Sequence, residues 1–115
     1  KDLLNKVVKV GDRSVIIEQV EVDSAETLKT ISFELKNDIA DLALVLAANV
    51  SDKPQISVML SDSLVSSGLN ASQMIRELAK EIKGGGGGQP FFATAGGKDI
   101  NGLANVVAKA KELLA

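Results

Sequence analysis

The 115-residue sequence contains no cysteine, histidine, tryptophan or tyrosine. Without cysteine it has no disulfide bond, no thiolate nucleophile and no thiolate metal ligand. Without histidine it lacks the commonest metal ligand, the usual general base near neutral pH, and every Ser–His or Cys–His catalytic pair. Carboxylates, lysines and hydroxyls remain for chemistry, so we expect no catalytic residues and no metal site in this chain.

Long hydrophobic runs and a strong excess of one charge are also missing. No apolar run approaches the roughly 18–20 residues of a membrane-spanning helix, and no signal-peptide pattern opens the chain, so we expect no membrane partner. The formal net charge is −2, with −6 in residues 15–68 and +2 in each flanking part. Typical free-standing nucleic-acid-binding domains are far more basic. Lys1 in place of Met suggests a piece of a longer protein.

Hydrophobic patterning predicts strands that alternate with helices in one domain, as the length allows. Residues 14–22, 42–48, 55–60 and 90–95 are predicted strands, because they are β-branched or continuously apolar. Helices are predicted to begin at Asp23 or Ser24, at Asn70, and after Gly97. We therefore expect an α/β or α+β fold, with a mixed sheet of about four to five strands and helices packed on it.

The first ten residues carry apolar side chains in a helical pattern, which fits the last turns of an amphipathic helix. These side chains are Leu3, Leu4, Val7, Val8 and Val10, and Gly11 follows as a helix stop. So short a helix has nothing of its own length to pack against. We therefore expect residues 1–13 to be the end of an upstream helical or coiled-coil segment, and residues 14–115 to form a single domain.

Seven of the ten glycines lie between Gly84 and Gly97, in the segment KGGGGGQPFFATAGGK from Lys83 to Lys98. Successive glycines let backbone N–H groups surround an anion, because no Cβ holds the ligand away. Gly96 and Gly97 precede a predicted helix, whose N-terminus favours a phosphate. A flexible linker is the usual meaning of a glycine run, but five residues between a predicted helix and a predicted strand are poorly placed for a tether.

The standard nucleotide-binding motifs do not fit this segment. A Walker A loop ending at Lys98 needs glycine where Phe92 stands and Ser or Thr where Asp99 stands. A dinucleotide fingerprint that begins with the glycine run needs glycine at Gln89. Phe91 and Phe92 alternate along a predicted strand, so we expect one in the core and the other exposed, where packing and stacking on a base are both open.

Several motifs together carry a family resemblance. GLNA (Gly68 to Ala71), an amphipathic helix, GGGGGQP and ATAGGKD resemble the C-terminal, DHH-associated domain of alanyl-tRNA synthetases. The match covers about residues 42–114, roughly two-thirds of the chain. A helical, coiled-coil-like part leads into this domain in the family's layout. The same superfamily includes single-strand exonucleases and small phosphoesterases.

The resemblance implies a non-catalytic C-terminal accessory domain that binds tRNA at its elbow, beside upstream synthetase domains, in the cytoplasm. The parent enzyme would attach alanine to its tRNA using ATP. ATP, Mg²⁺ and Zn²⁺ would then belong to the upstream catalytic and editing domains, with no cofactor in this chain. Some family members also dimerise through this domain, so a homodimer is a further expectation.

Candidate RNA- and phosphate-binding residues lie in the glycine segment and the helix before it. Arg76, Lys80 and Lys83 are spaced by four and three residues, which predicts a basic helical face leading into the glycines. The full set is Arg76, Lys80, Lys83, Gly84, Gly85, Gly86, Gly87, Gly88, Gln89, Gly96, Gly97 and Lys98.

Gln89 departs from the family pattern. Family members commonly have Arg after the glycine run, and the phosphoesterase relatives have His there. Loss of Arg removes a bidentate phosphate contact, and loss of His disfavours a nuclease-like role. A dimerisation or protein-interaction module and the substrate-binding domain of a DHH-family phosphoesterase remain as alternatives.

Overall fold

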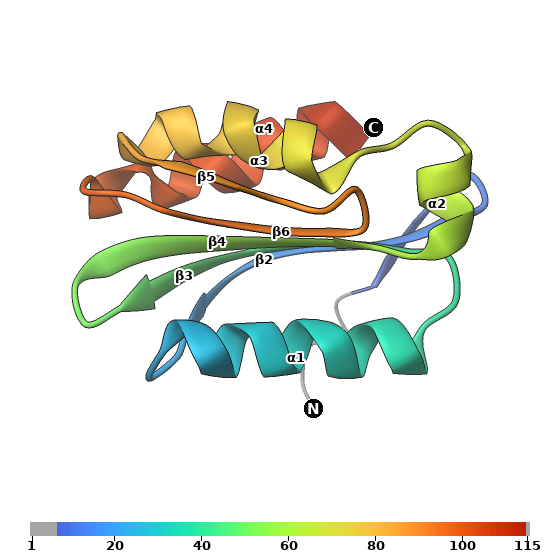
Figure 1. The fold of residues 1–115 in the computed structure, drawn as a ribbon, viewed down its shortest axis with the longest axis horizontal. Coiled ribbons are helices and arrows are strands. Elements are labelled where there is room, and N and C mark those ends of the chain that lie inside the picture. The colour runs from blue at the N-terminus through green and yellow to red at the C-terminus, as the bar shows by residue number, and fades with distance from the viewer. Residues whose placement is uncertain (1–6, 115) are drawn as a thin grey trace.

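A computed structural model describes residues 7–114 and shows a six-stranded mixed sheet covered by helices on both faces (Figure 1). The strand order is β1-β2-β3-β4-β6-β5, in which β2 and β3 are parallel and all other neighbours antiparallel. The strands are β1 Val8–Val10, β2 Arg13–Glu21, β3 Leu42–Val50, β4 Lys53–Leu60, β5 Gly85–Gly88 and β6 Phe92–Gly96. The helices are α1 Ala25–Asp38, α2 Asp62–Ser66, α3 Ala71–Ala79 and α4 Leu103–Leu114, with 3₁₀ turns at Lys80–Ile82 and Ile100–Gly102. The predicted class, a mixed sheet with helices packed on it, is confirmed.

The local sequence explains where two of the predicted helices, α1 and α3, begin. α1 crosses between the parallel strands β2 and β3, and Ser24 Oγ accepts a 3.2 Å hydrogen bond from Thr27 N at its N-terminus. α3 begins in the same way at Asn70, whose Oδ1 accepts from Gln73 N at 3.1 Å. Both N-caps agree with the sequence prediction.

The sheet separates two hydrophobic cores, one under α3 and α4 and one under α1 (Figure 1). Every residue from Leu42 to Ala48 in β3 is fully buried, as a strand covered on both faces requires. Ile75 and Leu78 of α3 fill the first core, while Leu28 and Leu35 of α1 fill the second. Within residues 7–114, no helix has both the length and the apolarity to cross a membrane.

The predicted helical lead-in is wrong for the part of it that the structure describes. Val8–Val10 form β1, which pairs with β2 across a turn at Gly11, where φ is 62°. β-branched residues favour extended backbone, and pairing with β2 supplies the hydrogen bonds that an isolated helix end lacks. The sheet thus continues across the predicted boundary between residues 13 and 14. Residues 1–6 of the predicted segment lie outside the described residues.

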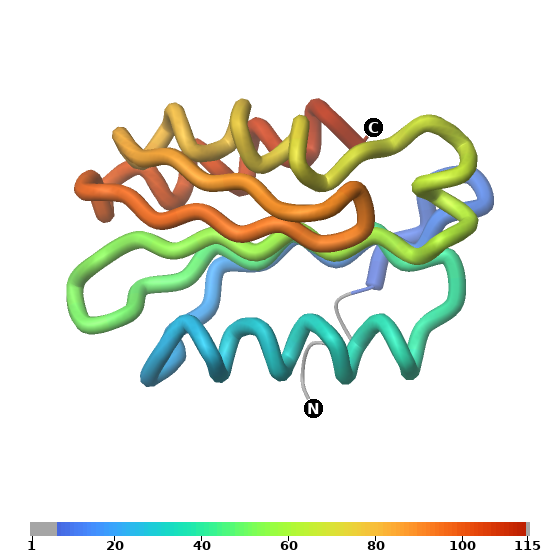
Figure 2. Tube along the Cα trace, in the orientation of Figure 1, coloured from blue at the N-terminus to red at the C-terminus, as the bar shows by residue number. Residues whose placement is uncertain are grey.

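The glycine run forms an edge strand, which the hydrophobic pattern of the sequence does not predict. Gly85–Gly88 pair antiparallel with β6, and the strand lies beside α3, as the tube in Figure 2 also shows. A Cβ at Gly86 would collide with the carbonyl oxygen of Thr94, and Gly84 and Gly88 approach the β6 backbone as closely. With β1, this strand brings the sheet to six strands where four to five were predicted.

Candidate functional site

The predicted basic residues gather where α3 ends, but they do not form one helical face. α3 ends at Ala79, Lys80 opens a 3₁₀ turn, and Lys83 follows that turn with left-handed backbone (φ 54°). The helix tightens and then ends before Lys83, so the i, i+4, i+7 spacing does not align this residue with Arg76 and Lys80. All three side chains are nevertheless exposed at the same end of the helix.

Lys80 has a carboxylate partner on the surface. Its Nζ lies 3.0 Å from Glu77 Oε2, and the two side chains are 71% and 47% exposed. The hydrogen bond and the charge of Lys80 lower the pKa of Glu77, and Lys109 adds a smaller lowering. An exposed pair of this kind contributes little to stability. Lys80 can therefore exchange Glu77 for a phosphate at little cost.

The N–H groups that follow Gly96 are not free to bind a phosphate. Gly97 N donates to Pro54 O at 3.1 Å. Lys98 N and Asp99 N both donate to Ile82 O, at 2.9 and 3.0 Å. These bonds tie the end of β6 to β4 and to the turn after α3, so the backbone donors predicted for an anion are used within the fold.

The N-terminus of the last helical segment carries its own carboxylate. Asp99 Oδ1 accepts a hydrogen bond from Asn101 N at 3.0 Å and caps the 3₁₀ turn that leads into α4. An anion at this position would meet a negative charge. Phosphate binding by the backbone at Gly97 is therefore not supported by the geometry, whereas a contact by the exposed Lys98 side chain stays a prediction.

The remaining candidates lie at the two ends of β5. The hydrogen bond from Lys98 N to Ile82 O places Lys98 next to the turn that Lys83 ends, so the structure brings these two lysines together. Gln89 lies at the other end, where its backbone exchanges hydrogen bonds of 2.8 and 3.3 Å with Phe92. Four strand residues separate the two ends, roughly 13 Å.

The phenylalanines do not alternate as predicted, because both lie on the α1 side of the sheet. Phe92 opens β6 and packs on Phe33 of α1, with ring centroids 5.1 Å apart, while Phe91 precedes the strand. Lys36 Nζ lies 5.0 Å from the Phe91 centroid, and Lys29 Nζ lies 6.0 Å from the Phe33 centroid. The sequence reasoning missed both lysines. The spacing of Lys29, Phe33 and Lys36 by four and three residues is the signal that places them on one face of a helix.

Asp41, an acidic side chain outside the glycine segment, serves local structure. Ser63 Oγ donates a 2.5 Å hydrogen bond to Asp41 Oδ1, which ties α2 to the turn before β3. Between residues 7 and 114, no group of three or more potential ligand side chains is placed to hold a metal ion.

Comparison with known protein families identifies the class to which this fold belongs. The model of the DHHA1 domain family matches residues 12–115, and the chain belongs to that family.

The curated relatives are alanine–tRNA ligases. The one from Cytophaga hutchinsonii is 56% identical over 115 residues, which cover 99% of this chain and 13% of that protein. The one from Bacteroides fragilis (strain ATCC 25285) is 49% identical over 90 residues, covering 77% of this chain and 10% of that protein. The chain therefore spans only 10–13% of the length of these relatives.

Solved structures agree with the sequence relatives. The C-Ala domain from Aquifex aeolicus alanyl-tRNA synthetase superposes with a TM-score of 0.84 at 29% identity, over 95% of this chain and 97% of that one. A DHH domain from a member of the s1p family of ribosomal proteins has a TM-score of 0.58 at 16% identity, over 97% of this chain and 28% of that one, and shares the fold alone. The predicted resemblance to the alanyl-tRNA synthetase domain is confirmed.

Proposed function

We propose that this chain is the non-catalytic C-terminal domain of an alanine–tRNA ligase and that it binds the elbow of tRNA. The observation that carries the proposal is the match to the C-Ala domain, which extends over 95% of this chain and 97% of that domain. The 56% identity to an alanine–tRNA ligase supports the same origin. Catalysis and editing would belong to other parts of the parent protein, which acts in the cytoplasm and uses ATP, Mg²⁺ and Zn²⁺ there.

The contact that the geometry supports is electrostatic and weak. Arg76, Lys80, Lys83 and Lys98 lie exposed around the same end of β5 and α3. Their positive charge is reduced by the neighbouring carboxylate of Glu77. RNA binding through a few lysine–phosphate contacts depends on the shape of the RNA more than on its sequence. Its affinity falls as the salt concentration rises, because each contact releases counterions.

A titration of the chain with tRNA at low salt tests this function. We expect Lys80→Glu and Lys83→Glu each to weaken binding several-fold, because each replaces a phosphate contact with a repulsion. Lys111→Glu is the matched control, since it makes the same charge change on α4, which covers the same face of the sheet as α3 but packs against β2 and β3. Unchanged affinity in both test variants would remove Lys80 and Lys83 from the interface. Absence of tRNA binding at low salt would contradict the function itself.

Self-association is the second candidate function, and one observation favours it. Val8 of β1 is 60% exposed, the largest exposure of any large hydrophobic residue among residues 7–114. Val8 lines an open groove of about 410 Å³ with Val10, Val15 and Ile17 of the same sheet edge and with Leu114. Pairing with a second copy of the chain, as expected for a homodimer, would cover this groove.

A further inference from the structure

The α1 side of the sheet is only partly covered. α1 packs on β3 and β4, while β6 and β5 lie further along the sheet at its edge. Phe92 packs into the core under α1, so Thr94, two residues further along β6, faces the same side. Directly paired residues of neighbouring strands share a face. Gly87 pairs with Thr94 and Gly85 with Gly96, so these residues extend an almost bare surface beyond α1.

This surface is hollowed next to α1. Thr94 is exposed and lines a groove of about 350 Å³ together with Lys29, Gln55 and the first turn of α1. On the sheet side the groove is lined by Gln55 and Ile56 of β4 and by Phe92 and Thr94 of β6, and its other wall, the first turn of α1, carries Lys29.

Two lysines, Lys29 and Lys36, lie along the rim of this surface. Lys29 and Lys36 are two helical turns apart, about 10.5 Å along α1. Each ammonium lies over a phenylalanine ring. The rings of Phe33 and Phe91 are half-buried beneath these ammonium groups. The rings hold the charges at the rim by cation–π attraction and do not offer an open face for base stacking.

The fold explains only some of the glycines of β5. A Cβ would collide with β6 at Gly84, Gly86 and Gly88, but at Gly85 and Gly87 it would meet no atom within 4 Å. Neither Gly85 nor Gly87 has positive φ. Packing and backbone conformation therefore allow a side chain at the two positions that face the α1 side.

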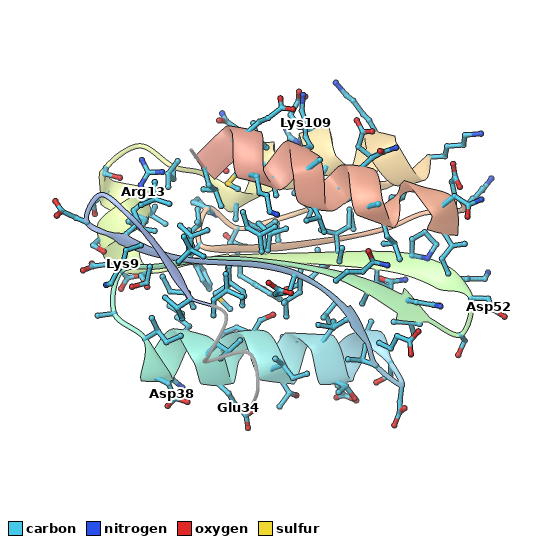
Figure 3. The ribbon with its side chains drawn as sticks, turned by 180° about the vertical axis from the view of Figure 1, so that it is seen from behind. Lys9, Arg13, Glu34, Asp38, Asp52 and Lys109 are labelled. Carbon is cyan, nitrogen blue, oxygen red and sulfur yellow. The ribbon has the colours of Figure 1, made fainter. Side chains whose placement is uncertain are left out.

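The surrounding charges favour an anionic occupant at this rim. Glu26 also lines the groove, so Glu26, Lys29 and Lys36 together carry one net positive charge. Glu34 and Asp38 lie on the side of α1 that points away from the sheet (Figure 3). The acidic side chains of Glu21, Asp23 and Asp52 gather at the end of the sheet where β3 turns into β4, around a separate shallow pocket.

Building on the proposed tRNA-binding function, we propose that the sugar–phosphate backbone of the RNA crosses the α1-side face of β6 and β5. Lys29 and Lys36 bind phosphates from the rim, Thr94 donates a hydroxyl, and the bare positions Gly85 and Gly87 let the backbone approach the sheet. The RNA then contacts the glycine strand on its outer face, while Lys83 and Lys98 bind at one end of that strand.

The test measures tRNA affinity against salt for the double variant Lys29→Gln/Lys36→Gln, with Lys111→Gln as the control. We expect affinity to fall about tenfold at 50 mM salt and the slope of log K against log[salt] to decrease by about 1.5–2, because two phosphate contacts are lost. The control keeps the wild-type slope. Glu26→Gln is expected to strengthen binding, since it removes the opposing charge from the groove.

A further variant tests the surface of β5 independently of the two lysines. Gly87→Val is expected to weaken tRNA binding several-fold while it leaves the unfolding temperature close to that of the wild type. If the change at Lys36 disturbs the packing of Phe91, the single variant Lys29→Gln still measures how a rim lysine contributes to tRNA affinity and to its salt dependence.

The outcomes distinguish this proposal from the function on which it depends. Wild-type affinity and slope in Lys29→Gln/Lys36→Gln, together with weakened binding in Lys83→Glu, would overturn the α1-side path and leave tRNA binding in place. If the wild-type chain binds no tRNA at low salt, that result contradicts the proposed function itself. If Gly87→Val binds tRNA normally but loses an interaction with another part of the parent protein, the surface is a protein interface and the proposal is overturned.

Discussion

At residue scale, the five consecutive glycines Gly84 to Gly88 differ in what surrounds them. A methyl group at Gly86 would collide with the carbonyl oxygen of Thr94 and lie 2.6 Å from Ala95 Cα, whereas one at Gly87 would meet no atom within 4 Å. Backbone atoms of a paired strand cannot move aside as the end of a flexible side chain can. Two residues of the same type, side by side, therefore have opposite tolerance for a single added carbon.

Gly86→Ala and Gly87→Ala form a matched pair that measures this difference. We expect Gly86→Ala to destabilise the chain by about 2–3 kcal/mol, at the upper end of the usual overpacking cost, because β5 must separate from β6. We expect Gly87→Ala to be neutral or to stabilise by up to about 1 kcal/mol, since alanine restricts the unfolded chain. Urea unfolding monitored by circular dichroism measures both. Equal losses of stability would contradict the one-sided approach of β5 to β6.

At the scale of elements, the end of α3 is where stability and binding conflict. Helices commonly end in a left-handed residue, usually glycine, because the left-handed conformation is costly for residues with a Cβ. Here that residue is Lys83 (φ 54°), although a run of glycines follows it directly. The conformation favours glycine at position 83, while the exposed charge serves the proposed RNA contact.

Lys83→Gly is therefore expected to raise stability while it lowers tRNA affinity. The gain is about 0.5–1 kcal/mol, because relief of the left-handed strain exceeds the added entropy of the unfolded chain. Lys83→Ala is the control: it removes the same charge but keeps a Cβ, so we expect affinity to fall with little change in stability. Thermal unfolding and a tRNA titration on the same samples supply both readings. A loss of stability in Lys83→Gly would show that the lysine side chain itself supports the helix end.

At the scale of the whole molecule, the two edges of the sheet present different surfaces. β5 is an edge without side chains, and on the α1 side Lys36 lies over Phe91, which directly precedes the neighbouring strand β6. β1 is the opposite edge and exposes Val8 beside an apolar groove that reaches the end of α4. An exposed edge strand with apolar side chains invites pairing with another chain. The molecule thus has one edge suited to RNA and another suited to a second copy of itself.

Sedimentation of the chain at increasing micromolar concentration tests the second edge. We expect the wild type to self-associate and Val8→Asp to remain monomeric, because a charge on β1 opposes edge-to-edge pairing. Val8→Thr keeps the β-branched shape and is expected to weaken association only partly. A wild-type chain that stays monomeric throughout would exclude this edge as a dimer interface, and the tRNA affinity of Val8→Asp is expected to equal that of the wild type.

Much of the central fold is predictable from sequence because its signals are local. The apolar run Leu42 to Ala48 predicts a doubly covered strand, and the caps at Ser24 and Asn70 mark the starts of α1 and α3. The sequence does not distinguish β1 from a helix end, because four or five apolar residues fit both periodicities. The candidate site was predicted in part: its basic residues are exposed where α3 ends, but their mutual arrangement depends on a 3₁₀ turn that residue spacing does not reveal.

The sequence alone determined which chemistry is excluded, since no fold can supply the missing histidine and cysteine side chains, and its motifs led to the DHHA1 family. Tertiary structure alone decided the role of the glycines, because residues without side chains carry no periodicity and become a strand only by pairing with β6. It also decided that the N–H groups of Gly97, Lys98 and Asp99 are used by distant carbonyl oxygens. It placed Lys29 and Lys36 beside rings that include Phe91, more than 50 residues away in the chain. Such contacts join segments far apart in sequence, so only the packed molecule determines them.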